Sequence, residues 1–151
     1  MAGVDRTRFI GLKTEPFTAD VEKGRLKFFA KAIGETNPIY SDEAAAKAAG
    51  HPTIPAPPTF LFCLNMEQPN PYDLISKMGI RVEQLLHGEQ SFQYLKPVYA
   101  GDRLTFQTTV TDTYSKKGGE LGFFVRDTDV KNQKGDLVAK LSGIAVVREN
   151  M

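Results

Sequence analysis

Apolar residues recur with helical spacing in the first third of the chain. Between positions 22 and 34 they stand at i, i+3, i+4 and i+7, which is the spacing of a helix that buries one face. Gly34 follows the last of them and is a typical helix C-terminal stop. The pattern therefore predicts a helix over 22–34 with a buried face made of Leu26, Phe29, Ala30 and Ile33.

A second, shorter helix is predicted after Ser41. Serine is a favoured N-cap residue, Asp42 and Glu43 suit a first helical turn, and an alanine-rich body runs up to Gly50. The two predicted helices are separated by a compact turn at 35–40, with the sequence Glu-Thr-Asn-Pro-Ile-Tyr. The first fifty residues are thus expected to be largely helical.

A proline-rich stretch leads into the most apolar part of the chain. Residues 51–58 must be extended or turning, because proline restricts the residue before it and has no N–H to donate. Pro58 can occupy the first position of a helix. Residues 59–66 are apolar on every side, which is typical of a helix enclosed by other structure. We expect this segment to be a central buried helix with core residues Phe60, Leu61, Phe62, Leu64 and Met66.

The second half of the chain has the pattern of strands. Four runs are rich in β-branched and aromatic residues and are joined by short Gly- and Asn-containing turns that suit antiparallel neighbours. The last three runs are expected to form a meander. The predicted strands cover 90–94, 103–114, 121–130 and 137–147.

Helices followed by a long antiparallel sheet predict an α+β fold. A sheet must cover its apolar face, and the all-apolar helix is the available cover. No repeat, low-complexity tract or linker divides the chain. We expect a single hot-dog domain over 1–151, in which the antiparallel sheet wraps around the central buried helix.

Composition narrows the range of functions. The chain has 151 residues and a formal net charge of +1, which is too little to attract nucleic acid or an anionic membrane surface. The longest apolar stretch is far shorter than the roughly 20 residues of a membrane-spanning helix. Cys63 cannot form an internal disulfide, and the N-terminal residues lack the apolar run of a signal peptide. We expect a cytoplasmic protein that binds neither nucleic acid nor membrane.

Four segments in order resemble one known family. The chain is similar to the MaoC-like dehydratase N-terminal domain, which also occurs as the non-catalytic subunit of bacterial (3R)-hydroxyacyl-thioester dehydratases. The resemblance covers nearly the whole chain and implies (R)-specific hydration or dehydration of acyl thioesters. The matching segments are FAKAIGETNPIYSD at 29–42, IPAPPTF at 54–60, LHGEQ at 86–90 and KPVYAGDRL at 96–104.

The first segment departs from the motif of catalytically active relatives. They carry an aspartate after the glycine, then Asn-Pro, then a histidine two residues beyond the proline; this chain has Glu35 and Tyr40 at those places. The reaction needs a base for the water and an acid for the α-carbon. Glu35 is one methylene longer than aspartate, and a misplacement of about 1 Å can cost about a hundredfold in rate. Tyrosine titrates near pH 10, about 3.5 units above histidine.

The third requirement is a donor for the oxygen of the developing enolate. Active relatives use a glycine N–H near the start of the central helix, where this chain has Pro57 or Pro58, and proline has no N–H. The later amides of Thr59 and Phe60 remain as donors. His87 is the best remaining titratable group, and Gly88 beside it lets a ligand approach the backbone.

These considerations define candidate sites with structural alternatives. The predicted catalytic residues are Glu35 and His87, and the predicted substrate-binding residues are Asn37, Tyr40, Pro57, Thr59, Phe60 and Gly88. Asn37 can equally well build an Asx turn, Tyr40 and Phe60 can be packing residues, and His87 can be a hydrogen-bonded structural residue. Two histidines and one cysteine offer no metal-ligand spacing, so neither a metal nor another cofactor is expected.

Four functions follow from the resemblance and the departures from it. The leading hypothesis is a subunit that shapes the acyl pocket of a hydratase or dehydratase, with the catalytic Asp and His supplied by a partner. The alternatives are a self-sufficient homodimeric hydratase using Glu35, Asn37 and His87, a thioesterase using Glu67, and a binding module without chemistry. The expected substrate is an acyl-CoA or acyl-carrier-protein thioester, and the expected assembly is a homodimer or a heterodimer with a catalytic hot-dog subunit.

Overall fold

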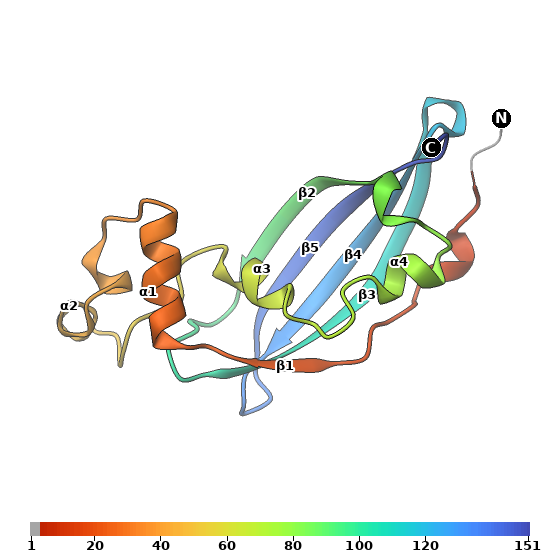
Figure 1. Cartoon of the computed structure of the whole chain (residues 1–151). Coiled ribbons are helices and arrows are strands. Elements are labelled where there is room, and N and C mark those ends of the chain that lie inside the picture. The colour runs from red at the N-terminus through yellow and green to blue at the C-terminus, as the bar shows by residue number, and fades with distance from the viewer. Residues whose placement is uncertain (1–3) are drawn as a thin grey trace.

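One antiparallel sheet of five strands forms the body of the protein. The computed structural model describes residues 4–151. The strands lie in the order β1-β3-β4-β5-β2, so β1 and β2 are the two edges (Figure 1). All four pairings are antiparallel, and β3, β4 and β5 form the predicted meander. Their bounds are β1 Phe17–Asp20, β2 Leu85–Tyr94, β3 Arg103–Lys116, β4 Leu121–Lys131 and β5 Leu137–Arg148.

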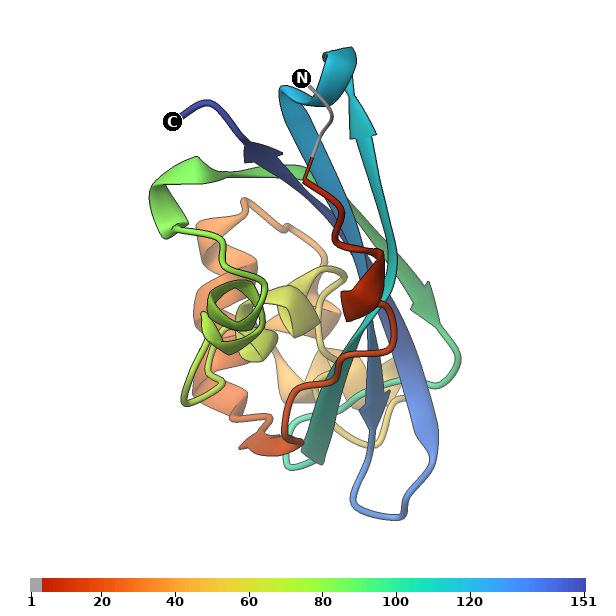
Figure 2. The ribbon, with the colours of Figure 1, turned by 90° about the vertical axis from the view of Figure 1, so that its right-hand side faces the viewer.

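The helices lie on one face of this sheet (Figure 2). Helices α3 and α4 lie in front of the strands, whereas α1 and α2 lie beyond one end of the sheet (Figure 1). Short 3-10 turns at 7–9, 38–40, 82–84 and 117–119 complete the fold. The helices are α1 Lys23–Ala32, α2 Glu43–Ala48, α3 Phe60–Asn65 and α4 Asp73–Lys77.

Helix α3 packs its apolar residues between the sheet and α1. Phe60, Leu61 and Leu64 are at most 2% exposed and belong to one core cluster with sheet residues such as Phe106. The ring of Phe60 meets Phe29 of α1 edge-on, with centroids 5.4 Å apart. The prediction of an α+β hot-dog fold with a central buried helix is therefore confirmed.

Several details of the sequence prediction were wrong. Helix α3 begins at Phe60 rather than at Pro58, because Thr59 takes a left-handed conformation just before it. The N-cap of α2 is Asp42 rather than Ser41, and its carboxylate accepts from two backbone amides. Ile33 and Met66 were predicted to be buried, but they lie at the last turns of α1 and α3 and are 51% and 55% exposed.

A β-bulge in the edge strand β2 changes which side chains face the helices. The ladder between β2 and β5 shifts register between His87 and Glu89. Gln90 pairs with Gly143, and His87 pairs with Ala145, so both lie opposite β5 residues that are buried on the helix side. In a ladder without this register shift, His87 would pair with Val146 and face the other side of the sheet.

Along residues 4–151, no helix has the length and apolar character needed to cross a lipid bilayer. The longest of them, α1, has ten residues.

Candidate functional site

Glu35 and Asn37 build their own turn. A carboxylate oxygen of Glu35 accepts from the backbone N–H of Asn37 at 2.8 Å, and Asn37 Oδ1 accepts from the N–H of Ile39 at 3.2 Å. The alternative of an Asx turn is thus confirmed, and Asn37 acts as N-cap of the 3-10 turn at 38–40. Both side chains are exposed, and neither lines the cavities described below.

The start of α3 has its amides engaged. Thr59 N–H donates to the hydroxyl of Tyr94 at 2.8 Å, and Phe60 N–H donates to the carbonyl of Pro57 at 3.1 Å. Pro57 and Pro58 have no N–H. Residues 57–60 therefore present no free amide to an enolate oxygen. Burial raises the pKa of Tyr94 while the Thr59 amide opposes this, so the phenol stays protonated at neutral pH.

Thr59 carries backbone strain at this point. Its φ angle is +73°, a left-handed conformation that β-branched residues rarely adopt. Strain of this kind persists only where the surroundings impose it. The hydrogen bond to Tyr94, 35 residues further along the chain, is one such restraint.

Tyr40 and Pro57 line a hollow of about 320 Å³ beside this hydrogen bond. The hollow is mostly apolar, with Tyr94 and Leu61 among its walls. Phe60 does not reach it or any other described cavity, because its side chain is part of the core. Tyr40 thus takes part in a surface hollow, separate from the one that contains His87.

His87 lines a second surface hollow, of about 290 Å³, which we call the outer hollow. Its ring meets Phe62 of α3 edge-on, with centroids 5.5 Å apart. The imidazole makes no hydrogen bond to any residue in the range 4–151, and no acidic residue lines the space. The lining residues are Phe29, Ile33, Thr59, Phe62, Cys63, His87, Gln90 and Phe92.

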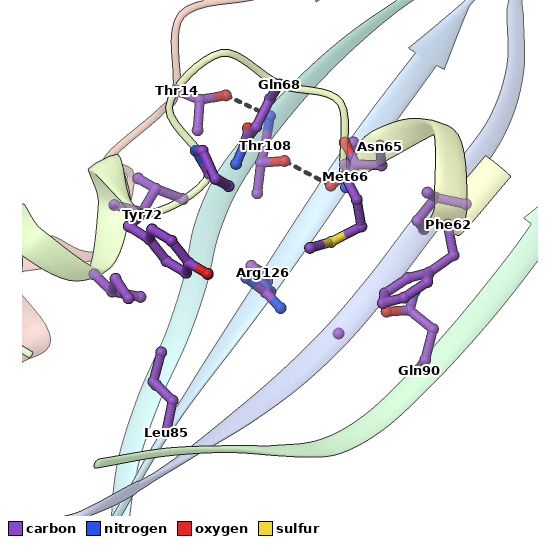
Figure 3. A pocket seen from close by; sticks show the side chains of 16 residues that line it. Thr14, Phe62, Asn65, Met66, Gln68, Tyr72, Leu85, Gln90, Thr108 and Arg126 are labelled. Carbon is purple, nitrogen blue, oxygen red and sulfur yellow. Dashed lines mark hydrogen bonds between the residues drawn. The ribbon is translucent and has the colours of Figure 1, made fainter. Parts of the chain in front are cut away.

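A more enclosed space, the inner cavity, lies between α3 and the sheet and has a volume of about 150 Å³. Phe62 and Gln90 line both this cavity and the outer hollow. Figure 3 shows Arg126 of β4 in the middle of the lining side chains, with Gln90 and Phe62 on one side and Tyr72 on the other. The inner cavity is thus adjacent to the outer hollow and has a cation, Arg126, in its wall.

Two buried threonine contacts form the polar wall of the inner cavity. Thr14 Oγ1 accepts from the backbone N–H of Thr108 at 3.0 Å, and the hydroxyls of Thr108 and Thr128 lie 2.7 Å apart (Figure 3). Asn65 Oδ1 is buried without a hydrogen-bond partner in the described part of the chain. This combination of apolar and polar lining suits a small organic ligand.

Sequence reasoning missed Arg126. Its neighbours Phe124 and Thr128 are buried, and Arg126 shares their side of β4 because side chains alternate along a strand. An arginine at an inward position was therefore detectable from the alternation, although arginine is usually a surface residue. The predicted residues are divided among places instead: Thr59 and His87 share the outer hollow, Tyr40 and Pro57 share another hollow, and Glu35 and Asn37 line neither.

Gly88 and Glu67 each contact other parts of the chain, which leaves no room for a ligand at Gly88 and no free carboxylate at Glu67. A Cβ at Gly88 would lie 2.9 Å from the carbonyl oxygen of Ile144 and 3.0 Å from Val146 Cγ2, so strand β5 fills the space beside it. Glu67 forms an ion pair with Arg25 of α1 beyond the end of α3. Among residues 4–151, no three His, Cys, Asp or Glu side chains cluster as a metal site would require.

Comparison with known proteins gives a consistent family. Residues 8–141 match the family described as FAS1-like, dehydratase domain region. A UPF0336 protein of Streptomyces griseus is 39% identical over 132 residues, which are 86% of this chain and 86% of that protein. A UPF0336 protein of Thermobifida fusca is 34% identical over 134 residues, or 89% and 86% of the two chains.

Solved structures have the same fold at lower identity. The HadBC (3R-hydroxyacyl-ACP dehydratase) complex of Mycobacterium tuberculosis matches with a TM-score of 0.80 and 23% identity, over 93% of this chain and 98% of that chain. A MaoC-like dehydratase matches with a TM-score of 0.82 and 22% identity, over 92% of this chain and 42% of that chain. The (R)-hydratase of A. caviae matches with a TM-score of 0.68 and 19% identity, over 93% of this chain and 98% of that chain.

Proposed function

The chain belongs to the FAS1-like dehydratase family of MaoC-like hot-dog proteins, and from this premise we propose that it is the pocket-forming subunit of an (R)-specific enoyl-thioester hydratase or 3-hydroxyacyl-thioester dehydratase. In that reaction water adds its oxygen to the β-carbon and a proton to the α-carbon, or the reverse. A partner hot-dog subunit supplies the Asp and His that move these protons. No cofactor is needed, and the acyl group is carried by CoA or acyl carrier protein.

The observation that carries this proposal is the engaged start of α3. Acyl-thioester chemistry requires donors aimed at the developing enolate oxygen, and loss of one such donor costs about a hundredfold to a thousandfold in rate. In this chain two prolines lack the amide, and the amides of Thr59 and Phe60 bond to Tyr94 and Pro57. The carboxylate of Glu35 bonds within its own turn, in a different place from the imidazole of His87.

The edge strand β2 is the surface that we assign to the partner. It pairs with β5 alone, and along its ten residues the other side has no strand neighbour in the described part of the chain. Leu86 and Tyr94 on this strand, and Leu95 just after it, are each close to half exposed. An unpaired edge of this length favours pairing with another chain. The outer hollow includes β2 residues, so a partner on this edge would bring its catalytic side chains close to His87 and Gln90.

Co-expression tests the subunit role. The chain is produced together with each hot-dog protein of the same organism that carries the Asp and His of the hydratase motif, and hydration of crotonyl-CoA is followed by loss of enoyl absorbance. We expect one pair to form a stable 1:1 complex whose turnover exceeds that of either chain alone by at least about a hundredfold. Failure of every such protein to bind the chain or to raise turnover would contradict the proposal.

The exposed imidazole of His87 supports a second candidate, a self-sufficient homodimeric hydratase. His87 faces the outer hollow without a hydrogen-bond partner among residues 4–151, and imidazole is the side chain most often used as a general acid or base. This candidate requires turnover by the chain alone and loss of that turnover in His87→Ala. Thioesterase activity has less support, because the carboxylate of Glu67 is paired with Arg25 and lines none of the described cavities.

A further inference from the structure

The inner cavity contains one charged side chain and no opposite charge. Its lining of 16 residues includes Arg126 but neither Asp nor Glu. Within residues 4–151, the guanidinium of Arg126 makes no hydrogen bond or ion pair, and it contacts the ring of Phe124 at 5.9 Å from the centroid. Burial lowers the pKa of Arg126 from its ordinary value, because desolvation disfavours the charged form. Arg126 is partly buried, and a charge withdrawn from bulk water without a partner is costly for the free protein.

The strand register places the side chain of Gln90 close to this guanidinium, on the far side of a glycine. Arg126, Gly143 and Gln90 are cross-strand neighbours on β4, β5 and β2. A Cβ at Gly143 would lie 3.1 Å from Gln90 Oε1 and 3.5 Å from Arg126 Nε. Because the middle residue has no side chain, the two polar side chains converge over it.

The remaining polar groups of the cavity favour an oxygen-bearing ligand rather than a hydrocarbon tail. Asn65 Oδ1 is buried without a partner in the described structure, and rotation of its amide would present the Nδ2 donor instead. A purely apolar acyl chain would leave Arg126 and Asn65 desolvated and unpaired, which disfavours binding. A carboxylate would satisfy both, because guanidinium binds it through two parallel hydrogen bonds.

We propose that the inner cavity binds a carboxylate at the far end of the acyl chain, so that the substrates are ω-carboxyacyl thioesters. The inference rests on the proposed function, since the thioester end would lie in the outer hollow. Phe62 and Gln90 line both spaces, so a chain that passes His87 and then Gln90 leads towards Arg126. The volume of about 150 Å³ suits the end of a short chain.

A titration with free acids tests the anion site without any thioester. The Nε–H resonance of Arg126 is identified by its absence in Arg126→Met and is followed while hexanoate or hexan-1-ol is added to the full chain. We expect hexanoate to shift this resonance to saturation and hexan-1-ol to leave it unchanged. No shift with hexanoate, or equal shifts with both compounds, would overturn the inference.

Calorimetry with matched thioesters tests the substrate class. Wild-type protein should bind adipoyl-CoA at least about tenfold more tightly than hexanoyl-CoA, as expected for one charge-assisted contact. Arg126→Met should abolish this preference, and Arg103→Met, which removes an exposed cation on β3, should retain it. If the methionine variant does not fold, Arg126→Lys keeps the charge but loses the two-pronged geometry, and it should reduce the preference.

The outcomes separate this inference from the proposed function. Binding of hexanoate at Arg126 without binding of either thioester supports the anion site and contradicts the acyl-thioester function. Equal binding of adipoyl-CoA and hexanoyl-CoA by wild-type protein supports the acyl-thioester function and overturns the carboxylate specificity.

Discussion

The helical segment before the sheet and the inner face of the sheet use their polar groups in opposite ways. In the helical segment, Glu35, Asn37, Thr59 and Glu67 each have a partner within the chain. On the sheet, His87 and Arg126 face cavities without a hydrogen-bond partner among residues 4–151. The segment that carries the family's hydratase motif is thus committed to structure, whereas the groups available to a ligand are His87 and Arg126 on strands and Asn65 at the end of α3.

The largest effect should come from truncation of Phe60, which tests the structural role of α3. Phe60 is 2% exposed and packs edge-on against Phe29. Phe60→Ala should lower the free energy of unfolding by about 3–5 kcal/mol, because it removes a buried ring and leaves a cavity. The control is Phe28→Ala on α1, where the side chain is 73% exposed and the change should stay within about 0.5 kcal/mol. Equal losses in urea denaturation would contradict the assignment.

Gly88→Ala should have the next largest effect and addresses the sheet side of the comparison. The new Cβ would meet the backbone oxygen of Ile144 at 2.9 Å. We expect a loss of about 1–3 kcal/mol in unfolding free energy, together with a change in the His87 environment as the bulge adjusts. Gly24→Ala in the first turn of α1 meets no atom within 4 Å and should be neutral or stabilising. A neutral result at Gly88 would mean that the bulge does not depend on glycine.

Tyr94→Phe should have a smaller effect, because it removes one hydrogen-bond acceptor. The N–H of Thr59 would lose its partner, at a cost of about 1 kcal/mol, and should exchange with solvent faster. Tyr114→Phe is the matched control, since the Tyr114 ring stacks on Phe123 and its hydroxyl has no hydrogen-bond partner in the described structure. Unchanged exchange at Thr59 in Tyr94→Phe would contradict the view that this amide is engaged.

The smallest effect concerns the exposed carboxylate of Glu43 at the start of α2. Hydrogen bonds from Lys23 and Lys47 lower its pKa to about 2 from a reference of 4.5. Because the pKa of Glu43 is lower in the folded than in the unfolded protein, its carboxylate stabilises the fold at pH values above the unfolded-state pKa of about 4.5. This contribution is lost as the pH falls from about 4.5 to about 2. The melting temperature of Glu43→Gln should therefore be slightly below that of wild type at pH 7. Near pH 2 the two melting temperatures should be the same. A difference that grows towards pH 2 would contradict this.

Much of the fold could be predicted from the sequence because burial leaves a local pattern. The period of 3.6 located α1, and runs of β-branched residues located the meander. Strand β1 was missed because four residues at 17–20 are too few to establish alternation, and α4 was missed because 73–77 is a single short turn after several prolines. Neither element has a periodic signal of its own.

The candidate site was less predictable, because its geometry depends on contacts between distant segments. The Asx turn at Asn37 is local and was anticipated as an alternative. The bond from Thr59 to Tyr94 joins residues 35 positions apart, and the inward direction of His87 depends on a register shift against β5. Arg126 would be taken for a surface charge unless the alternation of β4 is followed residue by residue.

The central claim is that the chain shapes an acyl pocket but lacks its own catalytic acid, base and enolate donor. The direct test is hydration by the purified chain alone, using crotonyl-CoA, trans-2-octenoyl-CoA and a carboxylate-ended enoyl-CoA, compared with a Glu35→Ala, His87→Ala double variant. The account predicts no turnover above the uncatalysed rate with any of the three substrates, and no difference between the two proteins. Turnover by the wild-type chain that disappears in the double variant would contradict it and establish a self-sufficient hydratase.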